Sequence, residues 1–379
     1  MKVALVHEYF STLGGSEAVA LTLRERFPHA PLYTLVADPA HMERGPLKDA
    51  EVHTSFLQRL PFSHHLYWAY YPLFPLAVER LDLREHDVVI SSSHGWVKNV
   101  LTRPGALHIC YCHTPLRWAW EGVEPGGRFL GPFKALAGVF MHYVRVWDAS
   151  ATPRVDLFVA NSREVAQRIR RYYGREAQVV YPPIDTDYFL PGNQDGEYFL
   201  LVSRLVPYKR VDLAIEAFNH LGLPLKVVGS GREMGRLRRL AGPTVELLGW
   251  QPRERLRQLY AGCRALILPG KEDLGMTSLE AQATGRPVIA YGAGGALETV
   301  VPGETGVLFP SQRVEALMVA IGHFNGMVWD KERIRHHALQ FDRRVFLERM
   351  EQLVWEAWGN HIAEAGEPRE PLSVTGARQ

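Results

Sequence analysis

Two glutamates in the second half of the chain have the type and spacing to hold a polar ligand at two points. Glu272 and Glu280 stand eight positions apart within segment 268–290. Carboxylates accept hydrogen bonds from adjacent hydroxyls of a sugar or a ribose, and backbone amides at a helix start attract phosphate. The segment therefore predicts a nucleotide-sugar site. The alternative is that Glu280 only caps a helix and Glu272 is a solvated loop charge.

Two cations and a histidine could complete such a site. Arg204 and Lys209 bracket a loop that follows a predicted strand, and they could converge on one diphosphate. The alternative is a solvated pair of cations. His113 follows a predicted strand of the first half, where it could donate to a sugar hydroxyl or to the leaving group. The alternative is a histidine without a function.

Other candidates have stronger structural alternatives. Gly14 and Gly15 stand between a predicted strand and helix, where backbone amides could approach a phosphate, although a tight turn without a ligand explains them as well. Trp250 could lie against a nucleotide base, but packing into the core is favoured. Asp185 and Asp187 have a spacing that suits a divalent metal. They follow a proline-rich linker, so a structural role is favoured.

The elements that must position these residues alternate between strand and helix in the second half. The predicted strands are 198–202, 225–228, 245–248, 264–268 and 287–290, with a hairpin or short strand at 303–309. The predicted helices are 211–218, 252–261, 312–324, 331–360 and one that starts at the capping box Thr277 to Glu280. This alternation is typical of a parallel sheet covered by helices.

The first half shows the same alternation less regularly. Strands are predicted at 3–6, 87–91, 107–112 and 155–160, a glycine-containing loop at 7–17, and helices at 129–148 and 163–171. Segment 56–81 combines many aromatic and basic residues, which suits a membrane interface or a lipid-linked acceptor. Two short helices packed on the core are an equal alternative.

Composition excludes several classes of protein. The chain has 379 residues, of which 46% are hydrophobic and 22% charged, so two globular domains are expected. A net charge of +2 gives no reason to expect nucleic-acid binding. The three cysteines suggest a reducing compartment, and Cys110 and Cys112 are interpreted as alternating residues of one strand rather than metal ligands. The chain starts with a short strand rather than a signal peptide and has no membrane-spanning apolar run, so a cytoplasmic location is expected.

A proline pair marks the predicted boundary between the domains. Pro182 and Pro183 interrupt regular structure between the two alternating patterns. The predicted division is therefore 1–183, 184–342, a helix at 343–362 that packs back on the first domain, and a tail at 363–379.

With these residues in place, the chain resembles the retaining glycosyltransferases of family 4. Gly14-Gly15, the strand-end His113, Arg204 with Lys209, and the glutamate pair occur in the family's order. The resemblance implies the GT-B fold, an α/β architecture in which two Rossmann-like domains face each other across a cleft. Stretches 111–117 and 272–282 are most similar to bacterial mannosyltransferases that build polysaccharides or lipid-linked sugars. Leu274, where the family more often has Phe, is a mild departure.

The resemblance also implies roles. Arg204 and Lys209 would neutralise the donor diphosphate, Glu280 would bind the ribose, Glu272 would orient the donor sugar, and His113 would contact the transferred sugar. The candidate catalytic residues are His113, Arg204, Lys209 and Glu272. The candidate donor-binding residues are Gly15, Arg204, Lys209, Trp250, Glu272, Leu274, Gly275, Met276, Thr277 and Glu280.

The expected function is retaining transfer of a hexose to a glycan or a lipid-linked sugar, without a metal or another cofactor. Mannose from GDP-mannose is the first choice of donor, and UDP-sugars remain open. A nucleotide-sugar epimerase, a phosphorylase and a non-catalytic sugar-binding partner are the alternatives. Peripheral contact with the inner face of the cell membrane is a hypothesis that rests on segment 56–81.

Overall fold

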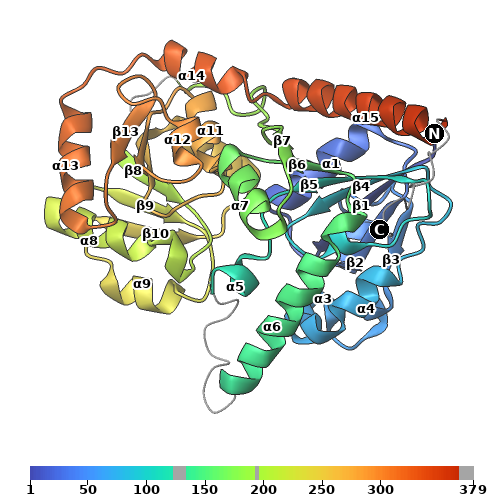
Figure 1. The fold of residues 1–379 in the computed structure, drawn as a ribbon. Helices are drawn as coiled ribbons and strands as arrows, with labels where there is room; N and C mark the ends of the chain where they lie inside the picture. Colours follow the sequence, from blue (N-terminus) through green and yellow to red (C-terminus); the bar gives the residue numbers. More distant parts are fainter. Residues whose placement is uncertain (123–133, 193–195, 367–379) are drawn as a thin grey trace, which may run out of the picture.

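The computed structural model describes residues 1–122, 134–192 and 196–366. Within these ranges the chain forms two parallel β-sheets, each covered by helices, in two lobes that lie side by side (Figure 1). We call the lobe built on β1–β7 the first lobe and the lobe built on β8–β13 the second lobe. The predicted α/β class, with two Rossmann-like units, is confirmed.

The sheet of the first lobe places β1 at its centre. Its strands are β1 (Val3–Phe10), β2 (Leu32–Ala37), β3 (Val52–Thr54), β4 (Val88–Ser93), β5 (Leu107–Cys112), β6 (Leu157–Ala160) and β7 (Ala177–Val179). They pair in the order β3-β2-β1-β4-β5-β6-β7. From β1 the chain adds strands first on one side of the sheet (β2, β3) and then on the other (β4 to β7), so a topological switch point lies between β1 and β4. Ligands of open parallel sheets bind at the carboxyl ends of the strands beside such a point.

The second sheet repeats this topology. Its strands are β8 (Tyr198–Val202), β9 (Leu225–Val228), β10 (Val245–Gly249), β11 (Cys263–Leu268), β12 (Val288–Tyr291) and β13 (Gly306–Phe309). They pair in the order β10-β9-β8-β11-β12-β13, so the switch point lies between β8 and β11.

Helices cover both sheets. In the first lobe they are α1 (Gly15–Arg26), α2 (Pro39–Glu43), α3 (Ser63–Leu66), α4 (Phe74–Glu79), α5 (Arg117–Trp120), α6 (Lys134–Ser150) and α7 (Arg163–Tyr173). In the second they are α8 (Val211–Leu221), α9 (Met234–Leu240), α10 (Arg253–Ala261), α11 (Met276–Ala283), α12 (Ala296–Thr299), α13 (Val314–Asn325) and α14 (Lys331–Leu339), followed by α15 (Arg343–Gly366). Short 3-10 helices span Phe56–Arg59, Tyr67–Leu73, Val97–Asn99, Thr152–Arg154 and Pro207–Lys209.

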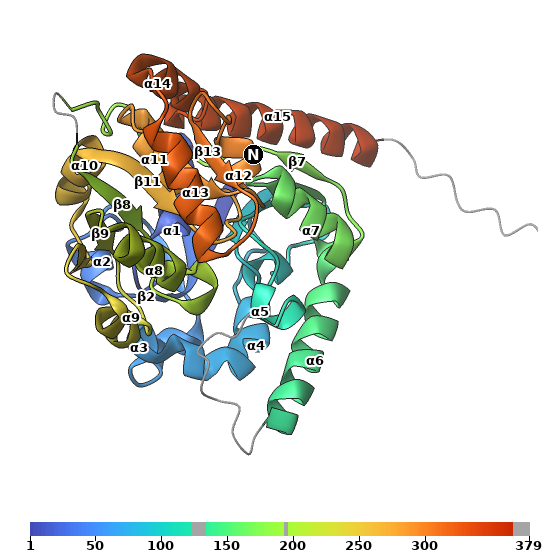
Figure 2. The ribbon, with the colours of Figure 1, turned by 90° about the vertical axis from the view of Figure 1, so that its left-hand side faces the viewer.

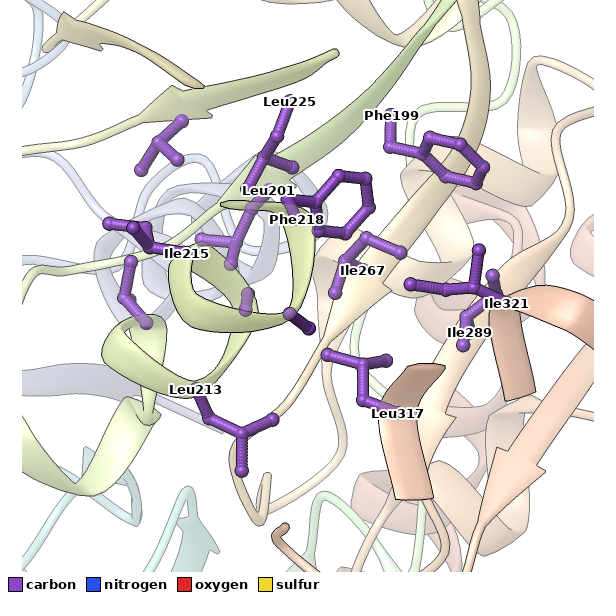
Figure 3. Close-up of a cluster of buried hydrophobic side chains, with 14 of the residues drawn as sticks. Phe199, Leu201, Leu213, Ile215, Phe218, Leu225, Ile267, Ile289, Leu317 and Ile321 are labelled. Atoms are coloured by element: carbon purple, nitrogen blue, oxygen red, sulfur yellow. The ribbon is translucent and has the colours of Figure 1, made fainter. Parts of the chain in front are cut away.

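The core of the second lobe holds its strand ends in place. Phe218 of α8 and Leu317 of α13 pack against Phe199 and Ile267 of the sheet, and all four are buried (Figure 3). Each such side chain contributes about 1.5–3 kcal/mol when it is fully buried. The loops after β8 and β11 therefore start from fixed positions.

The two segments that connect the lobes, around Ile184 and around Asp342, lie side by side. The Ile184 amide donates to the Phe341 carbonyl over 3.0 Å, and the Arg343 amide donates to the Ile184 carbonyl over 2.9 Å. Helix α15 then lies along the first lobe (Figures 1 and 2), where Phe346 and Met350 join the core that contains Leu5. The domain limits at 183 and 342 remain a prediction. The tail 363–379 falls mostly outside the described residues.

Four predicted elements differ from the structure. The predicted loop 7–17 is wrong at both ends, because β1 continues to Phe10 and α1 already starts at Gly15. The capping box is wrong because α11 already starts at Met276, after Gly275 in a left-handed conformation (φ +91°). Glu280 is thus the fifth residue of its helix rather than part of the first turn.

The third difference is the helix predicted at 331–360, which is two helices. Asp342 interrupts it, because its side chain accepts a 2.8 Å hydrogen bond from the Arg344 amide and so starts α15. Segment 56–81 forms several short helices rather than two. Residues 129–133 of the helix predicted at 129–148 lie outside the described part of the chain.

Candidate active site

An ion pair marks the switch point of the second sheet. Lys209 ends the 3-10 helix after β8, and Glu272 lies in the loop after β11. The Lys209 ammonium donates to Oε2 of Glu272, and the two side chains are only 16% and 11% exposed. A buried carboxylate needs such a partner. The structure therefore brings together two residues that the sequence separates by 63 positions.

Arg204 lies on the same side of this switch point and faces the first lobe. Its guanidinium donates to the Tyr208 hydroxyl over 2.9 Å. Although desolvation opposes the shift, interactions with Tyr208 and then with Tyr9, Tyr67 and Glu17 raise the pKa of Arg204. Three of these four groups belong to the first lobe. The guanidinium therefore carries positive charge into the space between the lobes.

Glu280 points inward from α11. The hydroxyl of buried Tyr260 donates a 2.7 Å hydrogen bond to Oε2 of Glu280. The residue keeps some solvent contact, but protein atoms surround its carboxyl group, and this burial raises its pKa while the Tyr260 hydrogen bond opposes the shift. Glu280 is thus a held acceptor rather than a helix cap. Among the described residues Oε1 has no hydrogen-bond partner, so it can accept from a ligand hydroxyl.

The start of α11 closes this part of the site. Leu274 is buried, Gly275 takes the left-handed turn, and Met276 and Thr277 begin the helix. A Cβ atom on Gly15 of the first lobe would lie 3.1 Å from Sδ of Met276. The glycine loop and the start of α11 therefore lie close together across the cleft, and a side chain at position 15 would require Met276 to shift by a few tenths of an ångström.

His113 lies at the carboxyl end of β5, beside the switch point of the first sheet. Its Nε2 is 2.9 Å from Oγ of Ser92, which follows from the pairing of β4 with β5. Burial lowers the pKa of His113 well below its ordinary value, and the neighbouring His94 and His7 add to this effect. The imidazole is therefore neutral at pH 7, so it can donate or accept a hydrogen bond but carries no charge.

A buried acid lies at the start of α1. Glu17 accepts hydrogen bonds from the Gly14 amide over 2.9 Å and the Ser16 hydroxyl over 3.1 Å. Against the opposing effect of burial, the His7 side chain lowers the pKa of Glu17 to about 2. The Gly14 amide is thus already bonded within the helix start. Of the two glycines, Gly15 is the one in contact with the second lobe.

Charged residues join the lobes beside the glutamate pair. Asp273 accepts from Arg168 and, over 3.4 Å, from Arg117, and Lys271 pairs with Glu164 over 2.6 Å. The Glu298 carboxylate accepts hydrogen bonds from the first two amides of α7, at 2.8 Å and 3.1 Å. The two neighbours of Glu272 therefore bind the first lobe, while Glu272 itself faces Lys209.

The remaining candidates lie apart from this centre. Trp250 is 71% exposed, so the favoured interpretation of a core residue is wrong. Asp185 pairs with Arg253 over 2.6 Å, and the exposed side chain of Asp187 pairs with Arg344 over 3.6 Å. In the parts of the chain that the structure describes, no group of three or more His, Cys, Asp or Glu residues is arranged to hold a metal ion.

A cavity of about 410 Å³ lies elsewhere, between α15 and the edge of the first sheet. Its lining includes Leu107, Arg175, Leu353 and His361, and it shares no residue with the candidate site. The candidate site is therefore defined by the side chains at the carboxyl ends of the strands and not by this cavity.

Sequence reasoning missed several residues of this centre. Glu8, Glu17 and His94 cluster near His113, and Asp273 and Arg168 connect the lobes. A signal exists for His94, because it follows the strand-end serines 91–93 just as His113 follows β5. None exists for Arg168, which lies 105 positions before its partner Asp273.

Two protein-family models match most of the chain. Residues 13–188 match Glycosyltransferase Family 4, and residues 189–324 match Glycosyl transferases group 1. The D-inositol 3-phosphate glycosyltransferase of Mycobacteroides abscessus is 28% identical over 278 residues, which cover 66% of this chain and 60% of that protein. The GDP-mannose-dependent alpha-(1-6)-phosphatidylinositol monomannoside mannosyltransferase of Mycolicibacterium smegmatis is 31% identical over 250 residues, or 54% of this chain and 65% of that protein. The chain thus matches less than two thirds of either relative's length.

Solved structures share the fold. Sucrose-phosphate synthase of Thermosynechococcus elongatus superposes with a TM-score of 0.73 at 18% identity and covers 95% of this chain and 100% of its own. Anabaena HepE, in complex with UDP-glucose, superposes with a TM-score of 0.69 at 17% identity, over 94% of this chain and 100% of its own. At these identities the likeness concerns the fold alone.

Proposed function

Since the chain belongs to glycosyltransferase family 4 and has the GT-B fold, we propose that it transfers a sugar from a nucleotide sugar to a hydroxyl of an acceptor. The observation that carries this proposal is the Lys209–Glu272 pair at the switch point of the second sheet, with Glu280 on the next helix. This arrangement offers a cation for phosphate and two carboxylates for hydroxyls, which are the groups of a nucleotide sugar.

The diphosphate is the leaving group in this reaction. Arg204 and Lys209 neutralise the negative charge that grows on it as the glycosidic bond breaks. Lys209 exchanges its bond to Glu272 for the phosphate, and Glu272 turns to a hydroxyl of the donor sugar. Glu280 holds the ribose. The two cations supply the neutralisation, so the proposed mechanism needs no metal.

The first lobe supplies the acceptor side. Neutral His113 contacts the transferred sugar near the reacting carbon. The acceptor oxygen attacks on the face that the diphosphate leaves, the electron pair of the broken bond goes to the diphosphate oxygen, and that oxygen takes the acceptor's proton. Configuration is retained. Positioning and electrostatics then provide most of the acceleration.

The donor and the acceptor are finer parts of the proposal. GDP-mannose is our first choice, supported by the name of the Mycolicibacterium relative, while the HepE complex with UDP-glucose keeps UDP-sugars as the second choice. The proposed acceptor is a glycan or a lipid-linked sugar. Exposed Trp250, at the carboxyl end of β10, is the proposed contact for the base.

Peripheral contact with a membrane fits such an acceptor. Large apolar side chains are exposed in segment 56–81, namely Phe62, Leu66, Trp68, Leu73 and Leu76. In the described ranges no helix is long and apolar enough to span a bilayer. We infer attachment to the inner face of the cell membrane, with a cytoplasmic location inferred from the cysteine content.

A nucleotide-sugar panel tests the proposal and its alternatives. Thermal-shift measurements with GDP- and UDP-sugars identify the donor, because a specific ligand raises the melting temperature. The labelled donor is then incubated with and without an acceptor lipid extract. A product that appears only with acceptor supports transfer. Isomerisation of the donor without any acceptor would establish an epimerase, and binding without turnover would establish a sugar-binding partner.

A further inference from the structure

A carboxylate buried at the end of β1 organises the loop after β4. Glu8 is fully buried and accepts hydrogen bonds from the amides of His94 at 2.9 Å and Trp96 at 2.8 Å and from the Ser93 hydroxyl at 3.0 Å. A buried carboxylate is tolerated only when several hydrogen bonds compensate for its loss of water. Trp96 is also buried, in the aromatic core of the lobe. The loop is therefore rigid, and so is the backbone of His94.

Glu8 also fixes the side chain of His94. Nδ1 of His94 lies 3.2 Å from Oε2 of Glu8. A carboxylate only accepts, so Nδ1 carries the proton, and Nε2 is the ring nitrogen left for a ligand. The His94 side chain is 20% exposed, and its Nε2 has no hydrogen-bond partner within the described residues. The imidazole thus presents an oriented ring nitrogen to the cleft.

The surroundings of His94 place it opposite the donor cations. Its ring centroid lies 5.0 Å from that of Tyr9, which in turn lies 4.3 Å from that of Tyr67. Arg204 of the second lobe lies near enough to these same two tyrosines for their ionised forms to raise its pKa. The switch points of the two sheets therefore face each other here, with Arg204 on one side and His94 on the other.

We propose that His94, oriented by Glu8, is an acceptor-binding residue whose Nε2 accepts a hydrogen bond from a hydroxyl of the acceptor sugar. The inference rests on the proposed transferase function. The Tyr9–Tyr67 pair gives the ligand its class, because the apolar face of a pyranose packs on aromatic rings while its hydroxyls reach a neighbouring polar group. A pyranoside fits this combination.

The two uses of the imidazole can be separated by substitution. In His94→Asn the amide nitrogen replaces Nδ1 and keeps the contact with Glu8, but the group at Nε2 is lost. In His94→Gln a polar group remains near Nε2, but the bond to Glu8 is lost. His53→Asn is the matched control, because His53 also pairs with a glutamate, Glu51, at 2.9 Å, but it lies exposed on the edge strand β3.

The experiment measures nucleoside diphosphate release from GDP-mannose and UDP-glucose with octyl α-mannoside and octyl β-glucoside as soluble acceptors. We expect His94→Asn to raise the acceptor KM at least tenfold, with unchanged melting temperature and an affinity for GDP or UDP within twofold of wild type. His94→Gln should raise the acceptor KM by a smaller factor, and His53→Asn should leave the acceptor KM unchanged.

Three results would overturn the inference. If His94→Asn leaves the acceptor KM unchanged, His94 only completes the hydrogen bonds of Glu8. If it weakens GDP or UDP binding equally, His94 belongs to the donor side. If the wild type binds GDP or UDP but neither glycoside increases nucleoside diphosphate release, a sugar hydroxyl is not the ligand of His94. A wild type that binds neither GDP nor UDP would instead remove the proposed function itself.

Discussion

The hydroxyl of Tyr260 donates a 2.7 Å hydrogen bond to Oε2 of Glu280 from a fully buried position. This bond directs the carboxylate and partly offsets the effect of burial, which raises the pKa of Glu280. Burial therefore makes the charged form of Glu280, the residue that we assign to the ribose, less stable than it would be in water.

Glu280→Gln should therefore separate binding from stability. Loss of a charged acceptor costs about 1.5–3 kcal/mol, so nucleotide affinity should fall roughly 10- to 100-fold in calorimetric titrations. The melting temperature at pH 7 should stay equal or rise. The raised pKa means that the folded state binds the proton more tightly, so this stability contribution is present at low pH and is lost as pH rises through the folded-state pKa. An unchanged affinity would contradict the ribose assignment.

Lys209→Met should weaken diphosphate binding and also leave Glu272 without its partner. An unpaired, nearly buried carboxylate costs roughly 1–3 kcal/mol, so the melting temperature should fall. The double variant Lys209→Met, Glu272→Gln should recover stability without recovering affinity. Calorimetric titration with GDP and UDP, combined with thermal denaturation, measures both quantities. Recovery of affinity in the double variant would show that Lys209 only pairs with Glu272.

Asp273→Asn should loosen the contact between the lobes. Asp273 bonds to Arg168 and Arg117 of the first lobe, so its loss should favour an open cleft and slow a reaction that needs both lobes. Small-angle X-ray scattering should show a larger radius of gyration, and turnover should fall severalfold. Glu304→Gln, which removes an exposed ion pair with Arg333, is the control and should change neither. Identical scattering for wild type and Asp273→Asn would contradict this role.

Membrane contact should depend on the apolar side chains of segment 56–81. Wild-type protein should float with vesicles that contain anionic lipid, and the double variant Leu73→Ser, Leu76→Ser should float less, because each buried apolar side chain contributes about 1.5–3 kcal/mol. Val328→Ser is the control, since Val328 is 98% exposed on the second lobe. Wild-type protein that stays with the pellet would contradict membrane attachment.

Part of this site could be predicted because its signals are local. The apolar run before Glu272 and the helix after it gave strand, loop and helix correctly, since burial and periodicity act over a few residues. The capping box misled because Ser278 bonds back to the Gly275 carbonyl over 2.7 Å, which lets the helix start earlier. Strand β2 is not among the predicted strands, although all six of its residues are buried.

The rest depends on tertiary structure. Glu8 and His94 meet only because β1 and β4 pair in parallel with His7 beside Ser92. Asp273 meets Arg168 only because the lobes close on each other. Such contacts join residues about a hundred positions apart, and a single sequence has no local pattern that marks them.

A crystal structure with bound GDP or UDP tests the central claim most directly. Our account predicts that the ribose hydroxyls contact Glu280, that the diphosphate lies between Arg204 and Lys209, and that the base lies toward Trp250. Nucleotide density away from both glutamates and both cations would contradict it.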